Sequence, residues 1–132
     1  MIAVDASAIL ALVLKEADAD IFEQALILAG RSVMSPVNSW EAHVRAAAVF
    51  GEAGRQATRG VMANLGVDVS VLSAADAEAA ADAFSRFGKG SGSGARLNLG
   101  DCFAYALAMR EGDGLLYKDA DFAKTDVKSA LP

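Results

Sequence analysis

The sequence of 132 residues is poor in the residue types on which several common kinds of site depend. It contains one cysteine, Cys102, so no disulfide can form within the chain. His43 is the one histidine, which effectively excludes a zinc site built from cysteine and histidine side chains. We expect Cys102 to be a small core residue and His43 to be a hydrogen-bonded residue on the side of a helix, without a catalytic part.

Basic residues and long apolar runs are also scarce. The chain carries 12 lysines and arginines against 17 aspartates and glutamates, a net charge of -5, which argues against a broad basic surface for nucleic acid. A local site in which metal ions offset clustered carboxylates stays possible. The apolar run at residues 8–14 is far too short to cross a bilayer, and residues 1–5 contain no basic leader. We therefore expect a cytoplasmic protein without membrane contact, folded as one domain over residues 1–132.

Short β-prone segments alternate with segments of helical periodicity along the chain. Strands are predicted at residues 2–4, 32–34, 67–72 and 115–117. Helices are predicted at residues 8–14 after a Ser7 cap, then at 18–28, 36–50, 55–65 and 74–87, and after Asn98. This order predicts the α/β class, with a mainly parallel sheet flanked by helices and ligands bound beyond the carboxyl ends of the strands.

The helix after Asn98 is the most informative segment. Asn98 can cap it, and Asp101, three residues later, can bond back to the cap in a capping box. No charge interrupts residues 102–109, which predicts a helix buried on every face. A carboxylate on the first turn of a buried helix needs a partner, because an unpaired buried charge is costly.

Other carboxylates stand where they can meet Asp101. Asp5 follows the first strand, Asp119 and Asp121 follow the last, and Glu41 lies early in a helix that leaves the same edge of the sheet. Converging carboxylates repel one another unless a cation is present, and Mg²⁺ and Mn²⁺ prefer oxygen ligands. A site of this kind activates water toward a phosphodiester, which is the chemistry of nucleases.

Several motifs in this order resemble those of one family. They are Asp-Ala-Ser-Ala at residues 5–8, Glu41, Phe-Gly-Lys-Gly at 87–90, Leu-Asn-Leu-Gly-Asp-Cys-Phe-Ala-Tyr-Ala-Leu-Ala at 97–108, Leu-Leu-Tyr-Lys-Asp-Ala-Asp-Phe at 115–122 and Thr-Asp-Val at 125–127. Over nearly its whole length the chain resembles PIN-domain ribonucleases of the VapC toxin type.

This resemblance implies a PIN-like fold in which Asp5, Glu41, Asp101 and Asp121 bind Mg²⁺ or Mn²⁺. It also implies a toxin that hydrolyses RNA with metal-activated water, a cognate VapB-type antitoxin and a homodimer. The family usually has glycine where this chain has Asp119. Whether Asp119 or Asp121 is the metal ligand after the last strand therefore stays open.

Alternative readings exist for the acidic residues and for the whole chain. Asp5 could cap the following helix, although Ser7 is better placed for that, and Glu41 could pair with Arg45 on the same helix face. Phosphate transfer of the haloacid-dehalogenase or receiver type is disfavoured, because the first of these patterns wants a second aspartate at Ser7. A PIN-like RNA-binding or RNA-processing domain without a toxin role, or an inactive binding module, remains an alternative.

Two further sets of residues are candidates for contacts with partners. Arg45, Lys89, Arg96 and Lys118 could contact RNA phosphates. Ile9, Leu12, Val13 and Phe22 could line a groove for an antitoxin, although burial in the core is the more common fate of such residues.

Overall fold

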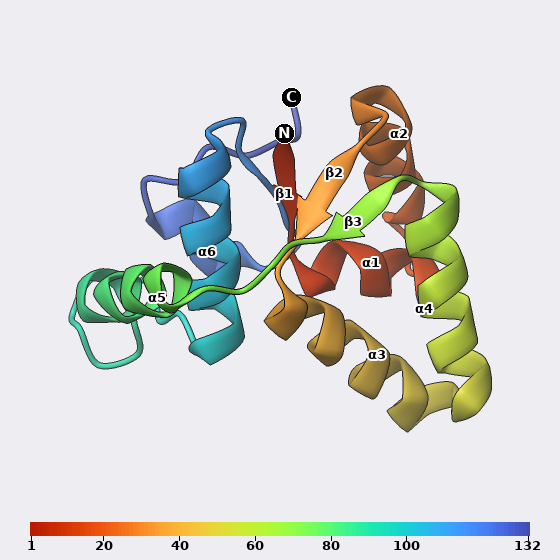
Figure 1. Ribbon diagram of the computed structural model, residues 1–132, viewed down its shortest axis with the longest axis horizontal. Helices are drawn as coiled ribbons and strands as arrows, with labels where there is room; N and C mark the ends of the chain where they lie inside the picture. The colour runs from red at the N-terminus through yellow and green to blue at the C-terminus, as the bar shows by residue number, and fades with distance from the viewer.

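A four-stranded parallel sheet forms the centre of the computed structural model, which describes residues 1–132 (Figure 1). Its strands are β1 (Ile2–Val4), β2 (Ser32–Met34), β3 (Val67–Val69) and β4 (Leu115–Leu116), arranged in the order β3-β2-β1-β4. Every neighbouring pair is parallel. All four predicted strands are confirmed, and β3 and β4 end earlier than predicted.

Six α-helices surround this sheet. They are α1 (Ala6–Val13), α2 (Ala19–Ala29), α3 (Pro36–Phe50), α4 (Glu52–Asn64), α5 (Ala74–Phe87) and α6 (Leu99–Glu111), and a 3-10 helix, η1 (Ala120–Lys124), follows β4. Each predicted helix is present, which confirms the α/β class with a parallel sheet between helices. None of the helices is both long and apolar enough to cross a membrane.

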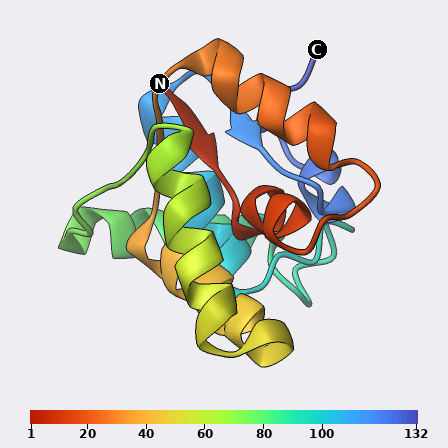
Figure 2. The same cartoon turned by 90° about the vertical axis from the view of Figure 1, so that its right-hand side faces the viewer.

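The hydrophobic core is divided by the sheet, because successive strand residues point to opposite faces. Ala3, Val33 and Leu115 pack into one cluster with α5 and α6. Their neighbours Val4 and Met34 belong to a second cluster, with α1, α2 and α4. Figure 2 looks at this second side and shows α2, α1 and α4 over the strands. The carboxyl ends of β1 and β4 therefore lie between these two hydrophobic clusters.

The residues that could have lined an antitoxin groove lie mostly in that second cluster. Ile9, Val13 and Phe22 are buried there, and Leu12 is half-buried against it. The groove interpretation is therefore wrong for the three buried residues, because α1 is buried along most of its length and Phe22 lies on the buried face of α2. The exposed apolar side chains of this region are on the outer face of α2, including Leu28, which is 90% exposed.

The glycine-rich segment between α5 and α6 is a loop with a closed base. Gly88 and Leu97 form an isolated bridge, with Lys89 N–H donating to the Leu97 carbonyl at 3.1 Å. Leu97 N–H donates to the Phe87 carbonyl at 2.9 Å. The tip, residues 89–94, is exposed and turns through glycines of positive φ. Asn98 follows directly, so the bridge holds the start of α6 against the end of α5.

Candidate metal centre and active site

Asp5 connects the end of β1 to the start of α1. Its N–H donates to the Leu116 carbonyl of β4 at 2.9 Å. Its carboxylate Oδ2 accepts from Ser7 N–H at 3.0 Å and from Ser7 Oγ at 2.5 Å. Asp5 is therefore the N-cap of α1, and the prediction that Ser7 is the cap was wrong by two residues, because the helix begins at Ala6 instead of Ala8.

The cap leaves half of the Asp5 carboxylate without a partner. The residue is 4% exposed, and its Oδ1 is a buried oxygen with no hydrogen-bond donor. Ser7 Oγ meanwhile accepts from Lys118 N–H at 3.0 Å, which attaches Asp5 to the segment that follows β4. A buried, unsatisfied carboxylate oxygen is unfavourable without a cation or another donor.

Asp101 stands on the first turn of α6, as predicted, in a capping box with Asn98. Asp101 N–H donates to Asn98 Oδ1 at 2.9 Å, and Asn98 N–H donates to Asp101 Oδ2 at 3.1 Å. Asp101 is only 7% exposed because α6 is buried along most of its length. The cap therefore holds this carboxylate in place at the edge of the sheet.

Glu41 of α3 reaches the same turn of α6. A Cβ at position 100 would lie 3.1 Å from both carboxylate oxygens of Glu41, closer than side chains normally approach. Gly100 thus leaves the space in which the Glu41 carboxylate lies, directly beside Asp101. Glu41 forms no ion pair with Arg45, so the alternative role considered for Glu41 is not observed.

The carboxylates of Asp5, Glu41, Asp101 and Asp119 are close enough to interact electrostatically, and this interaction contributes to the pKa values of Asp5 and Asp101. Burial raises the pKa of Asp5 to about 6, and the charges of Glu41 and Asp119 add to the effect, while the Ser7 hydrogen bonds oppose it. Burial raises the pKa of Asp101 to about 7, with contributions from Asp5, Asp119 and Glu41. A bound divalent cation would reverse this repulsion.

The segment after β4 brings Asp119 into this group more directly than Asp121. Asp119 caps η1, its Oδ1 accepting from Asp121 N–H at 3.0 Å. The charge of Asp119 contributes to the raised pKa of both Asp5 and Asp101, and Asp121 is not among the main causes of either shift. Asp121 is half-buried within η1.

The donor set fits a hard divalent cation. The polar atoms of this acidic group are carboxylate oxygens, the ligands that Mg²⁺ and Mn²⁺ prefer, and Oδ1 of Asp5 has no hydrogen-bond partner and so has a lone pair available. No three of the acidic side chains already converge on a single coordination position. Mg²⁺ commonly takes one or two carboxylates directly and keeps waters, so a full protein cage is not required.

Asn38 is a residue of this region that the sequence reasoning missed. It is fully buried in α3, and its Nδ2 donates to the Gly100 carbonyl at 2.9 Å. The sequence contained one signal for it: Asn38 is polar and lies three positions before Glu41, on the same face of the helix. Its partner lies 62 residues away in sequence and could not be inferred locally.

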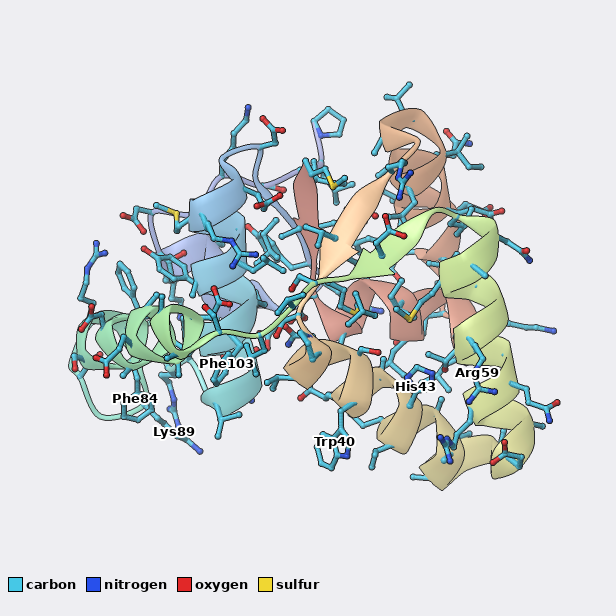
Figure 3. All side chains as sticks on the ribbon, viewed as in Figure 1. Trp40, His43, Arg59, Phe84, Lys89 and Phe103 are labelled. Carbon is cyan, nitrogen blue, oxygen red and sulfur yellow. The ribbon has the colours of Figure 1, made fainter.

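The basic candidates and His43 have different environments. Lys118 Nζ pairs with Glu16 and Asp18, both at 3.0 Å, whereas Arg45, Lys89 and Arg96 are exposed and form no ion pair. His43 Nδ1 lies 2.8 Å from the Ser39 carbonyl, and Figure 3 shows the ring between α3 and α4. The predicted structural role of His43 is confirmed.

Comparison with known proteins gives a consistent result. The PIN domain family matches residues 2–128. The chain belongs to the PIN-domain family. Ribonuclease VapC42 of Mycobacterium tuberculosis is 37% identical over 131 residues, covering 96% of this chain and 97% of the relative. Ribonuclease VapC30 of the same organism is 38% identical over 130 residues, with 98% of each chain covered.

These relatives place the chain in the VapC group of PIN domains, which confirms the resemblance drawn from its motifs. The crystal structure of Mycobacterium tuberculosis VapC20, described as a toxin that cleaves the sarcin-ricin loop, superposes with a TM-score of 0.78. The match covers 100% of both chains at 18% identity, so it supports the PIN fold alone.

Proposed function

We propose that this protein is a VapC-type endoribonuclease, the toxin of a toxin–antitoxin pair, and that Mg²⁺ or Mn²⁺ is its cofactor. The relatives at 37% and 38% identity carry the name ribonuclease and align over almost the whole chain. The observation in this molecule that supports the activity best is the bare, buried Oδ1 of Asp5 in the field of three other carboxylates.

In this proposal Asp5, Glu41 and Asp101 hold the cation, and the carboxylate after β4 completes the set. When bound, a divalent cation supplies Lewis acidity toward water and toward the phosphodiester oxygens. Ser7 fixes one oxygen of Asp5 and so directs the other into the site. The Asn98 N–H fixes Oδ2 of Asp101 in the same manner.

The two candidates after β4, Asp119 and Asp121, have different support. Family resemblance implies Asp121, and the shared field with Asp5 and Asp101 favours Asp119. We propose that Asp119 is the carboxylate after β4 that takes part in metal binding in this chain. Asp121 donates its N–H to the Asp119 carboxylate and holds it in place.

A nuclease assay tests the activity. Purified protein should cleave RNA with Mg²⁺ or Mn²⁺ and lose cleavage in excess chelator. Asp101→Asn should abolish cleavage, whereas Asp76→Asn, which alters the matching capping box on α5, should retain it. Equal cleavage with chelator and with metal would contradict the metal-dependent assignment. Sequencing the 5′ ends of RNA from expressing cells would then identify the substrate and the cleavage site.

The antitoxin is proposed to be a VapB-type protein that places a basic side chain beside the carboxylates of Asp5, Glu41 and Asp101. Arginine suits this position because its planar guanidinium pairs with carboxylates through two hydrogen bonds. Expression of this chain alone should arrest growth, and co-expression of an adjacent antitoxin gene should restore it and yield a complex. Harmless expression of active protein would contradict the toxin role while leaving the nuclease role intact.

A homodimer is also part of the proposal. Trp40, Phe84 and Leu99 are exposed to 66%, 46% and 67%, and a groove of about 550 Å³ between α5 and α6 is lined by Phe84, Leu99 and Phe103. In Figure 3, Trp40 and Phe84 both lie along the lower side of the molecule as drawn. Exposed apolar side chains of this size are typical of interfaces. Light scattering should give a dimer mass, and Trp40→Glu should reduce it to that of a monomer.

A further inference from the structure

Asn38 is a buried amide whose orientation is determined by its surroundings. It is fully inaccessible to solvent, and its Nδ2 donates to the Gly100 carbonyl at 2.9 Å. A carbonyl oxygen only accepts, so the nitrogen of the amide must face it. The Oδ1 of Asn38 is consequently left buried without a donor.

Asn38 and Glu41 contact the same turn of α6. They are three positions apart on α3 and so share a face of that helix. Asn38 bonds the carbonyl of Gly100, and the Glu41 carboxylate lies 3.1 Å from the position that a Cβ of residue 100 would take. Asp101 is the next residue of that turn. The Asn38 bond therefore links α3, which carries Glu41, to the turn of α6 that carries Asp101.

Stability alone does not account for an amide at this position. Gly100 is inside α6, whose regular pattern already gives its carbonyl a backbone partner. The bare Oδ1 of Asn38 carries a desolvation cost that an apolar side chain of the same shape would avoid. What an apolar side chain cannot provide is a directional link between the two helices.

We propose that Asn38 is a positioning residue that sets the separation of Glu41 and Asp101 for metal binding and catalysis. This inference rests on the proposed nuclease function. Asn38 itself touches neither substrate nor cation in the proposal; it acts through the backbone of Gly100.

The test compares Asn38→Leu with Thr58→Val. Thr58 is also fully buried in a helix, and its Oγ1 donates to the carbonyl of Gly54 at 2.9 Å. Both variants therefore replace a buried polar side chain with an apolar one of similar shape and remove one hydrogen bond to a glycine carbonyl. Thr58 lies in α4, outside the acidic group.

Three quantities are measured for wild type and both variants: kcat and KM for RNA, the Kd for Mn²⁺ alone by calorimetry, and the Tm. Asn38→Leu should lower kcat about tenfold or more, because small displacements of catalytic groups are costly, while KM stays within about twofold. Its Mn²⁺ affinity should fall about fivefold or more by the same displacement. Thr58→Val should change neither quantity.

Wild-type kcat and Mn²⁺ affinity in Asn38→Leu would overturn the proposal. Equal losses in both variants, in step with their Tm values, would also overturn it. If Asn38→Leu does not fold, Asn38→Ala, which only removes atoms, replaces it in the comparison. If wild type binds Mn²⁺ without cleaving RNA, the nuclease proposal fails, and the Mn²⁺ affinities still decide the role of Asn38.

Discussion

Replacement of Asp101 by asparagine should stabilise the metal-free protein at neutral and alkaline pH. Burial and neighbouring charges raise the pKa of Asp101 from 3.8 to about 7. The folded protein therefore binds a proton more tightly than the unfolded chain does. Stability from this group is fully present below pH 3.8 and is lost progressively as the pH rises to about 7. Asparagine has the same shape, keeps an oxygen for the Asn98 N–H and carries no charge.

The size of the gain follows from that shift. Each tenfold change in proton affinity corresponds to about 1.4 kcal/mol, so the full difference corresponds to roughly 4 kcal/mol. Asparagine forfeits about 0.3–1 kcal/mol of attraction to the positive end of the α6 dipole, and partial solvation of the site reduces the gain further. We expect a net increase of about 2–3 kcal/mol at pH 8, or a rise in Tm of roughly 5–10 °C.

Thermal unfolding followed by circular dichroism in chelator, from pH 4 to pH 9, measures the effect. The advantage of Asp101→Asn over wild type should grow between pH 4 and pH 7 and then level off. Asp76 is the matched control, because it has the same position in the α5 capping box but a pKa lowered by the Ser73 N–H and Arg110. Asp76→Asn should destabilise. A fall in stability for Asp101→Asn at pH 8 would refute the argument and make its charge a requirement of the fold.

Three further outcomes follow from the same site. Mg²⁺ or Mn²⁺ at ten times its Kd should add about 1.4 kcal/mol to the stability of the wild type, measured in a thermal shift assay. The variant Asp5→Asn/Asp101→Asn should lose most of this gain. Equal gains in both proteins would show that the metal binds elsewhere. Asp119→Asn should lower kcat more than Asp121→Asn, and the reverse order would restore the assignment implied by the family. Gly100→Ala should fold, since alanine suits a helix, but its Cβ would press on the Glu41 carboxylate and reduce kcat about tenfold; full activity would show that Glu41 can move freely.

Features that depend on neighbours along the chain could be predicted from the sequence. The capping boxes of Ser73 with Asp76 and of Asn98 with Asp101 are relations over three residues, and both are present. Ser35-Pro36 at the start of α3 and Gly51 after its end also predicted both ends of this helix correctly. The uncharged run of α6 predicted a helix buried on all sides, and most of the run is buried against the sheet and α5, but Met109 at its end is 48% exposed.

Features that depend on distant pairing could not be predicted. Both Asp5 and Ser7 could cap α1 by sequence, and the cap is Asp5, whose N–H is bonded to the Leu116 carbonyl over a hundred residues away. The order β3-β2-β1-β4 has no local signal either. The orientation of Asp119 relative to Asp121 depends on a single short 3-10 turn, which residue spacing does not specify.

The bridge at the base of the loop between α5 and α6 separates two parts of the chain that are adjacent in sequence. The backbone of Leu97 is hydrogen-bonded to Phe87 and Lys89, on either side of Gly88, so we expect a change in the tip to leave Asn98 in place. The tip therefore offers a place for insertion: a short epitope or a fluorophore-bearing cysteine between Ser91 and Gly92 would extend into solvent. A label there would report on the approach of large molecules to the start of α6 without altering the acidic residues themselves.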